Sequence, residues 1–453
     1  MKKTLMGLTL VLSVSAITAQ KPLPANMFQL KLSNGLQVLV VEDNSVPLAT
    51  IELAVKNGAY TESPDINGLS HLYEHMFFKA NKKYSDETSF TDRRQQLGIV
   101  ANATTSAEMV NYFFTLPSYN VKPGLELMNT AVRYPAFKAT EIERENQVVD
   151  AEFQRLESNP HFLFADAMNH HLWGDGYCRK KPIGDHDVIR SATSEKMEDI
   201  HSRYYYPNNS LLIVAGNVAH DAVFKEVAKV FGDWPMSAFD PWQKYPVPEF
   251  KPLEKSDYFI VESPIAQQPL LQYSWQGPDT RNDTLNTYVA DIFSYVLLQH
   301  SSKFHRALVE SGLALDIDAN YSTQKYTGPI SITIVPNPAK IKECVAAVED
   351  QLNQLDNDDY FTDEQLAISK KQYEIRQLRE EEVTSQFTHV LSYWFCSASI
   401  DYFNTYQDNL NKVTHEDMRN YVRKYIKNKP HCAGLMISPG LRQSVHPENF
   451  FHL

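Results

Sequence analysis

Cysteine is scarce in this 453-residue chain, which has only four cysteines, far apart in the sequence. None of them forms a CxxC pair, so the chain lacks the spacing of a zinc knuckle or of a thiol redox motif. A disulfide bond between two of them is compatible with an oxidising compartment, but scattered structural thiols are the simpler interpretation. The four residues are Cys178, Cys344, Cys396 and Cys432.

Basic stretches are absent as well. Lysine and arginine number 43 against 55 aspartates and glutamates, which gives a formal net charge of −12. An acidic chain without a basic segment argues against nucleic acid or anionic lipid as the main partner. With 43% apolar and 22% charged residues, the composition is that of a globular protein rather than a disordered one.

A short apolar run stands at the beginning of the chain. Residues 1–19 combine Lys2 and Lys3 with this run and end in small residues, of which Ala16 and Ala19 are candidate cleavage points. The run is too short for a membrane span, and no stop-transfer segment follows it. We therefore expect residues 1–19 to be the signal peptide of an exported protein, periplasmic or secreted, without a membrane span.

A proline-rich segment divides the mature chain into two halves of similar size. Five prolines lie between residues 235 and 252, a density that argues against any helix or inner strand there and suits a linker. Strand-like and helix-like segments follow in a similar order on its two sides, which indicates a degenerate repeat of one α/β unit. We predict homologous domains at 20–234 and 255–453, joined by a linker at 235–254.

Hydrophobic patterns predict individual elements in both halves. Alternating residues around an Asn-Gly turn signal indicate strands within 28–58. A long helix is expected over about 139–158, and the apolar segment 210–218 reads as a buried strand. In the second half, YVADIFSYV stands where the first half has LSHLYEHMF, and it carries no metal ligands.

Residues 68–79, GLSHLYEHMFFK, place three proton-binding side chains in an otherwise mostly apolar helix. At about 100° per residue, His71 and His75 lie about 40° apart, and Glu74 points to the same side. Two imidazoles at this spacing are typical of a helical zinc site, and the carboxylate can act on metal-bound water. For the motif alone, the alternative is a pair of satisfied core histidines beside a surface glutamate. The opposite, apolar face is formed by Leu69, Leu72, Tyr73 and Met76.

The predicted helix near residue 145 offers a third ligand. An ionised carboxylate that faces a core costs several kcal/mol unless it is paired or bound to metal. In the alternative arrangement Val148 and Phe153 face inward, and the two glutamates of the helix, at positions 145 and 152, are solvated. The helix alone does not decide, but two histidines that need an anionic third ligand favour the metal site. One stripe of this helix contains Ile142, Glu145, Val149, Glu152 and Leu156.

The motif HLYEH is followed, 77 residues after His75, by Glu152 in RENQVVDAE. This combination resembles the pitrilysin/insulinase family of inverted zinc metallopeptidases. Further segments are similar to the family, among them LSNGLQVLVVEDN, NATTSAEMVNYFFT, YYYPNNSLLIVAGNV and SSKFHRALVESGLALDIDA. The resemblance covers nearly all of the mature chain. It implies an α+β fold of two homologous domains, each with a mixed, mainly antiparallel sheet packed against helices, which together form half of a clamshell.

The same resemblance assigns roles to individual residues. It implies one zinc ion per chain, bound by His71, His75 and Glu152, with Glu74 as the general base on zinc-bound water. Glu145 matches the family's supporting acid on the same helix face as Glu152. The VANATT strand matches the edge strand that pairs with extended substrate, so two of its residues are candidate backbone contacts. These are Asn102 and Ala103.

One part of the family pattern is missing. Active members also use an Arg and a Tyr a few residues apart in the C-terminal half, but the matching stretch, GPISITIVPNPAK at 328–340, contains neither. Tyr326 lies just upstream. The resemblance therefore implies the zinc-bearing subunit of a heterodimer whose homologous partner supplies the Arg/Tyr pair, with a homodimer as the alternative.

The expected function is a zinc-dependent endopeptidase that hydrolyses peptides or unfolded polypeptide segments in a closed chamber. The competing interpretation is a non-catalytic binding or assembly subunit of the same fold. The intact HLYEH motif and Glu152 argue against it, since such subunits tend to have lost these residues.

Overall fold

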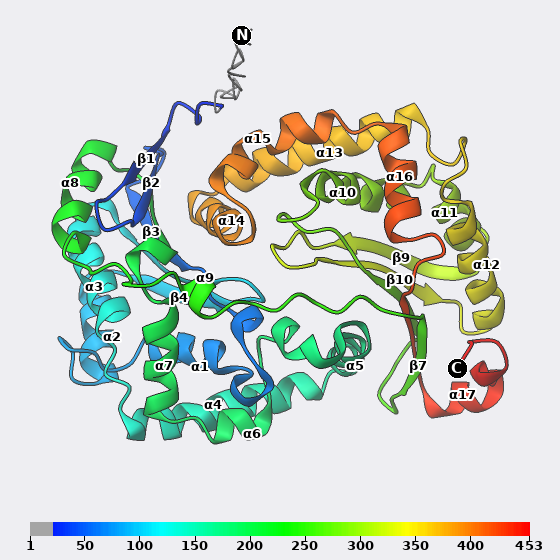
Figure 1. The fold of residues 1–453 in the computed structure, drawn as a ribbon, viewed down its shortest axis with the longest axis horizontal. Coiled ribbons are helices and arrows are strands. Elements are labelled where there is room, and N and C mark those ends of the chain that lie inside the picture. The colour runs from blue at the N-terminus through cyan, green and yellow to red at the C-terminus, as the bar shows by residue number, and fades with distance from the viewer. Residues whose placement is uncertain (1–20) are drawn as a thin grey trace, which may run out of the picture.

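Two mixed β-sheets, one in each half of the chain, organise the structure, a computed structural model that describes residues 21–453 (Figure 1). The predicted signal peptide at 1–19 lies outside the described residues. Among residues 21–453, no helix has both the length and the apolar character needed to cross a membrane.

The N-terminal sheet has six strands in the order β1-β2-β6-β3-β5-β4. Only β2 and β6 run parallel, and every other neighbouring pair is antiparallel. β6 is buried along its whole length, as its apolar sequence predicts. The strands are β1 (Met27–Lys31), β2 (Gln37–Glu42), β3 (Leu48–Val55), β4 (Val100–Thr105), β5 (Val110–Pro117) and β6 (Ser210–Gly216).

The C-terminal sheet has five strands in the order β7-β11-β8-β10-β9. Its single parallel pair is β7 with β11. Without β1, the N-terminal sheet has the same order and the same parallel pair, so the two halves share one topology. The predicted fold class, two homologous domains with mixed and mainly antiparallel sheets, is confirmed. The strands are β7 (Asp257–Glu262), β8 (Leu270–Gln276), β9 (Ala314–Tyr321), β10 (Pro329–Pro336) and β11 (Cys432–Ile437).

Helices follow the strands in a similar order in both halves of the chain. In the N-terminal half they are α1 (Leu69–Met76), α2 (Glu87–Gln96), α3 (Val121–Arg133), α4 (Ala139–Glu157), α5 (Pro160–Trp173), α6 (His186–Arg190), α7 (Ser194–Tyr204) and α8 (His220–Phe231). In the C-terminal half they are α10 (Thr284–Leu298), α11 (Lys303–His305), α12 (Ile341–Gln354), α13 (Asp363–Glu382), α14 (Thr384–Ser397), α15 (Ile400–Asn411), α16 (His415–Tyr425) and α17 (Pro439–Val445).

One helix of the C-terminal half joins the two domains. α14 packs on β3 and β6, so it covers a face of the N-terminal sheet (Figure 1). Its residues Phe387, Leu391 and Phe395 share an apolar cluster with Leu39 and Ile213 of that sheet. The halves are therefore held together by apolar burial as well as by the linker.

The proline-rich linker contains one short helix, α9 (Pro241–Lys244), so the expectation that no helix forms there is wrong for a single turn. The Asp240 carboxylate accepts a hydrogen bond from the backbone N–H of Trp242 at 2.9 Å. Pro241 stands at the first helical position, where its missing N–H breaks no hydrogen bond. The predicted domain boundaries at 234 and 255 stay a prediction.

All four cysteines are buried and free. This arrangement agrees with the interpretation of scattered structural thiols.

Candidate metal centre

The helix α1 presents the predicted motif with its apolar face in the core. Leu69, Leu72, Tyr73 and Met76 are all buried. The ring of Tyr73 stacks on that of Tyr205, with centroids 4.1 Å apart. This packing fixes the rotation of the helix about its axis, so that the side chains of the motif project from its other side.

The N-terminus of α1 is held by a residue that the sequence reasoning did not identify. Glu62 accepts hydrogen bonds from the backbone N–H groups of Gly68 and Ser70, each at 2.7 Å. Burial raises the pKa of Glu62 to about 7, and these two hydrogen bonds act in the opposite direction. Because Gly68 has no capping side chain, Glu62 satisfies backbone donors that would otherwise be buried and unpaired.

A close approach of two glycines completes this anchor. Gly68 has a φ of +95° and Gly184 a φ of +87°. A Cβ atom added to Gly184 would lie 2.3 Å from the Cα of Gly68, closer than any side chain allows. The backbone at the start of α1 therefore packs directly against the backbone of the segment that precedes α6.

α4 faces the site with the stripe predicted from the sequence. Ile142 and Val149 are buried, and Glu145 is buried between them. Val148, which the alternative arrangement placed inward, is 47% exposed, although Phe153 is buried as that arrangement expected. The side chain of Glu152 is 32% exposed. The inward face of α4 thus carries both carboxylates.

Three of these side chains converge across α1 and α4. The Oε2 atom of Glu152 lies 3.9 Å from Nε2 of His71 and 3.8 Å from Nε2 of His75. The ligand atoms of the three residues all lie within 4.8 Å of one another. Burial, together with the smaller effect of the neighbouring His75, lowers the pKa of His71 to about 4. His71 is therefore a neutral imidazole near pH 7, the form that binds a metal ion.

The donor set fits a zinc ion. Ligand atoms roughly 2 Å from one tetrahedral ion would lie about 3.3 Å apart, close to the spacings in this cluster. The Nδ1 atom of His75 lies 3.2 Å from Oε2 of Glu145. A carboxylate acceptor keeps the proton on Nδ1 and leaves the lone pair of Nε2 free for the metal. The fit rests on the orientation of His75 as well as on the three ligand atoms.

Lys79 supports Glu145 and was not identified from the sequence. Its Nζ atom lies 2.7 Å from Oε1 of Glu145 and 2.8 Å from Oε1 of Glu87. Burial alone would raise the pKa of Glu145, but hydrogen bonds with His75 and Lys79 lower it below its ordinary value. Glu145 therefore stays ionised beside His75.

We expect Glu145→Gln to weaken zinc binding about 10–100-fold, the range for residues that orient a ligand. Glutamine keeps the size of the side chain but loses the charge that holds the proton on Nδ1 of His75. Competition with a chelator at fixed pH measures the change. Glu87→Gln is the matched control, because Glu87 contacts Lys79 but not His75. An unchanged zinc affinity in Glu145→Gln would contradict this orienting role.

Glu74 lies beside the cluster without belonging to it. Its Oε2 atom accepts a hydrogen bond of 2.6 Å from the hydroxyl of Thr105. Burial raises the pKa of Glu74, and the hydrogen bond from Thr105 acts in the opposite direction. The carboxylate therefore has a fixed position and a raised proton affinity, both of which suit a general base.

The strand β4 ends at the site. It pairs with β5 alone in residues 21–453, so it is an edge strand. Asn102 is exposed and Ala103 is buried, as expected for neighbours on a strand, and Thr105 reaches Glu74 from its end. The free edge of β4 thus runs toward the metal cluster.

The C-terminal half places no Arg/Tyr pair within 328–340, which forms β10 and its flanks. Tyr326 is buried upstream of that strand. Its ring lies 5.5 Å from that of Tyr60, and the guanidinium of Arg281 lies 4.3 Å from its centroid. Tyr326 therefore packs between the two halves of the chain.

Known protein families match both halves. The family model described as Insulinase (Peptidase family M16) matches residues 37–180, and the one described as Peptidase M16 inactive domain matches residues 191–373. The chain is 22% identical over 344 residues to the uncharacterized zinc protease YmxG of Bacillus subtilis, which covers 75% of this chain and 80% of that protein.

Other relatives match one part of the chain. The zinc protease PqqE of Helicobacter pylori is 31% identical over 241 residues, 51% of this chain and 52% of that protein. The mitochondrial-processing peptidase subunit beta of Bos taurus is 27% identical over 202 residues, 45% of this chain and 41% of that protein. The chain thus spans about half the length of PqqE and less of the processing-peptidase subunit.

Solved structures share the fold along nearly the whole chain. A protease from Helicobacter pylori superposes with a TM-score of 0.79 at 21% identity, over 91% of this chain and 99% of that one. The first half of the periplasmic protease PqqL from Escherichia coli gives 0.76 at 16% identity, over 94% and 95%. At these identities the likeness concerns the fold.

Proposed function

Because the chain belongs to the insulinase family of peptidases, family M16, we propose that it is a zinc-dependent endopeptidase acting on peptides or unfolded polypeptide segments. The observation that carries the proposal is the convergence of His71, His75 and Glu152 within 4.8 Å, beside a buried Glu74. Three protein ligands and an adjacent carboxylate are typical of a catalytic rather than a structural zinc site, which is closed by a fourth protein ligand.

Each residue of the site has its own role in the proposed reaction. His71, His75 and Glu152 would hold one zinc ion, which supplies polarisation of a peptide carbonyl and acidification of a water molecule. Glu74 accepts a proton from the attacking water and delivers it to the leaving amine. Thr105 holds one oxygen of Glu74 and leaves the other free for this transfer.

The substrate would bind along the edge of β4. The backbone groups of Asn102 and Ala103 are the proposed contacts, through main-chain hydrogen bonds to an extended peptide. Such hydrogen bonds read no side chain, so cleavage would depend on the flexibility of the substrate more than on its sequence. The position of Thr105 supports this path, because it links the end of the strand to Glu74.

A homologous partner subunit would complete the chamber. The stretch 328–340 lacks the Arg and Tyr that active family members use, and one relative is named a subunit beta of a processing peptidase. We therefore propose the zinc-bearing subunit of a heterodimer, half of a clamshell, with a homodimer as the alternative. The predicted signal peptide and the periplasmic PqqL support export to the periplasm or beyond the cell.

Peptidase activity of the purified chain alone separates these assemblies. We expect slow turnover of a fluorogenic peptide library, with a strong increase when the partner copurified from the native source is added. Full activity without a partner would contradict the heterodimer but not the proposed peptidase activity.

The zinc content of the purified chain distinguishes the peptidase from a non-catalytic subunit. This alternative is supported by the match of residues 191–373 to the family model described as an inactive domain. One tightly held zinc ion per chain supports the enzyme, and none supports the scaffold.

A further inference from the structure

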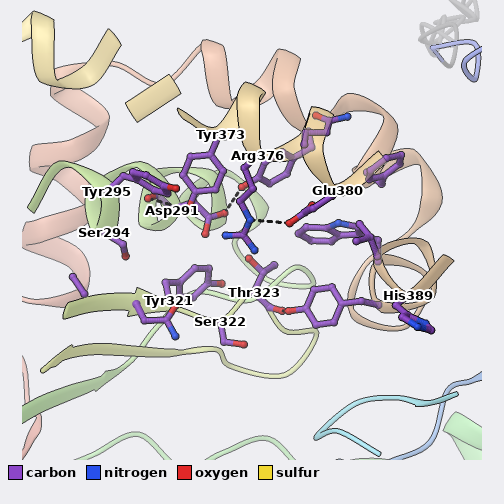
Figure 2. Close-up of a pocket in the computed structure, with 18 of the residues that line it drawn as sticks. Asp291, Ser294, Tyr295, Tyr321, Ser322, Thr323, Tyr373, Arg376, Glu380 and His389 are labelled. Atoms are coloured by element: carbon purple, nitrogen blue, oxygen red, sulfur yellow. Dashed lines mark hydrogen bonds and ion pairs between the residues drawn. The ribbon is translucent and has the colours of Figure 1, made fainter. Parts of the chain in front are cut away.

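The C-terminal half contains a cavity of about 740 Å³ between α10, α13, α14 and the end of β9 (Figure 2). Seven of its 19 lining residues are Phe, Tyr or Trp, and charged and polar groups lie among them. Such a composition is typical of small-molecule sites, in which apolar walls surround a small number of polar anchors. These aromatic lining residues are Tyr295, Tyr321, Tyr373, Tyr393, Trp394, Phe403 and Tyr406.

The cavity occupies the place that corresponds to the metal centre of the first half. The N-terminal half runs β3-α1-α2-β4-β5-α3-α4, and the C-terminal half runs β8-α10-α11-β9-β10-α12-α13. In this order α10, β9 and α13 correspond to α1, β4 and α4, the three elements that build the metal centre. The second copy has thus kept a site at this position but with different side chains.

Asp291 on α10 is a buried carboxylate in the lining of this cavity. It is 8% exposed, and its Oδ2 atom accepts a hydrogen bond of 2.6 Å from the hydroxyl of Tyr406. The hydroxyl of Tyr373 donates a hydrogen bond to the backbone carbonyl of Asp291 at 3.3 Å. Burial raises the pKa of Asp291 to about 7, while Tyr406 and Arg376 act in the opposite direction. A buried carboxylate in this state is stabilised by a positively charged group placed beside it.

Arg376 on α13 offers the complementary group. Its Nε atom donates to Oε1 of Glu380 at 2.8 Å. The hydrogen bonds within the described part of the chain involve neither of the two terminal nitrogens of its guanidinium. Figure 2 shows Arg376 and Asp291 facing the same space. A guanidinium with a free fork binds a carboxylate through two parallel hydrogen bonds.

We propose that this cavity binds a free α-amino acid with a large apolar or aromatic side chain. The ammonium group would lie on Asp291, the carboxylate on the free fork of Arg376, and the side chain against the aromatic walls. The zwitterion satisfies both charged anchors and adds no net charge to the cavity. The site is separate from the zinc chemistry and does not depend on it.

Calorimetry of the full chain with L-phenylalanine, L-tyrosine, L-tryptophan and L-leucine tests the proposal. At least one of them should bind, and its N-acetyl and amide derivatives should bind about 10–100-fold more weakly, since each lacks one charged group. Equal binding of the amide would show that the ammonium group alone is recognised, as at a peptide N-terminus, and would overturn the proposal. So would the absence of binding by all four amino acids.

Variants of the two anchors complete the test. Asp291→Asn and Arg376→Gln should each weaken binding about 10–100-fold with an unchanged circular dichroism spectrum. Arg379→Gln is the matched control, because Arg379 lies on the same helix but does not line the cavity. Unchanged affinity in both anchor variants would overturn the proposal. The readout is heat of binding, so its failure is distinguishable from failure of the proposed peptidase activity.

Discussion

Glu74→Gln is expected to lower kcat by a factor of about 10²–10⁴ while the chain still binds one zinc ion. Glutamine has the same size and its amide oxygen can accept the hydrogen bond from Thr105, so the local packing is kept. The amide cannot accept a proton from water, which removes the proposed general base. His71, His75 and Glu152 are untouched, so the metal affinity should change little.

Two measurements on one preparation check this expectation. Metal analysis gives the zinc content per chain, and cleavage of a fluorogenic peptide gives kcat. Glu143→Gln is a suitable control, since Glu143 stands on α4 but is exposed and makes no contact with the cluster in the described residues. Turnover near the wild-type rate in Glu74→Gln would contradict the assignment of Glu74.

The convergence of the three candidate ligands could be predicted from the sequence because its signals are local. The i, i+4 spacing of His71 and His75 and the stripe through Glu145 and Glu152 are properties of single helices. The apolar residues beside the histidines indicate which face of their helix turns inward, whereas for the helix of Glu145 and Glu152 the sequence left two faces open. Only the pairing of the two helices had to come from elsewhere, and the family resemblance supplied it.

The supporting residues could not be predicted, because their partners belong to other elements. Lys79 stands three residues after α1, but its role depends on how α1 crosses α4, which brings Nζ to Glu145. Thr105 reaches Glu74 from a strand, and Glu62 reaches the start of α1 from a loop. No periodicity in the sequence marks such contacts.

The same limit applies to the larger architecture. Nothing in the sequence of α14 indicates that this helix covers a face of the N-terminal sheet. The cavity at Asp291 could not be predicted from the sequence either. Asp291 lies in YVADIFSYV, which lacks the histidines of the motif, and only the tertiary structure brings Arg376 to the same cavity.

Glu152→Ala is expected to lower zinc affinity by about 10³-fold or more and to abolish hydrolysis. The change removes one of three ligand atoms, so its effect should exceed the roughly 10–100-fold range of residues that only orient a ligand. The free energy of unfolding of the metal-free chain should change little, because the Glu152 side chain is partly exposed and no buried partner is left unpaired.

The control lies on the same helix. Glu157→Ala removes a carboxylate that contacts His186, 3.1 Å away, and belongs to no metal cluster in residues 21–453. Chelator competition should therefore rank the variants Glu152→Ala, Glu145→Gln and Glu157→Ala in order of decreasing effect. Wild-type zinc affinity in Glu152→Ala would mean that the third ligand lies elsewhere. An effect of Glu145→Gln as large as that of Glu152→Ala would make Glu145 a ligand, because orientation alone does not remove a metal ion.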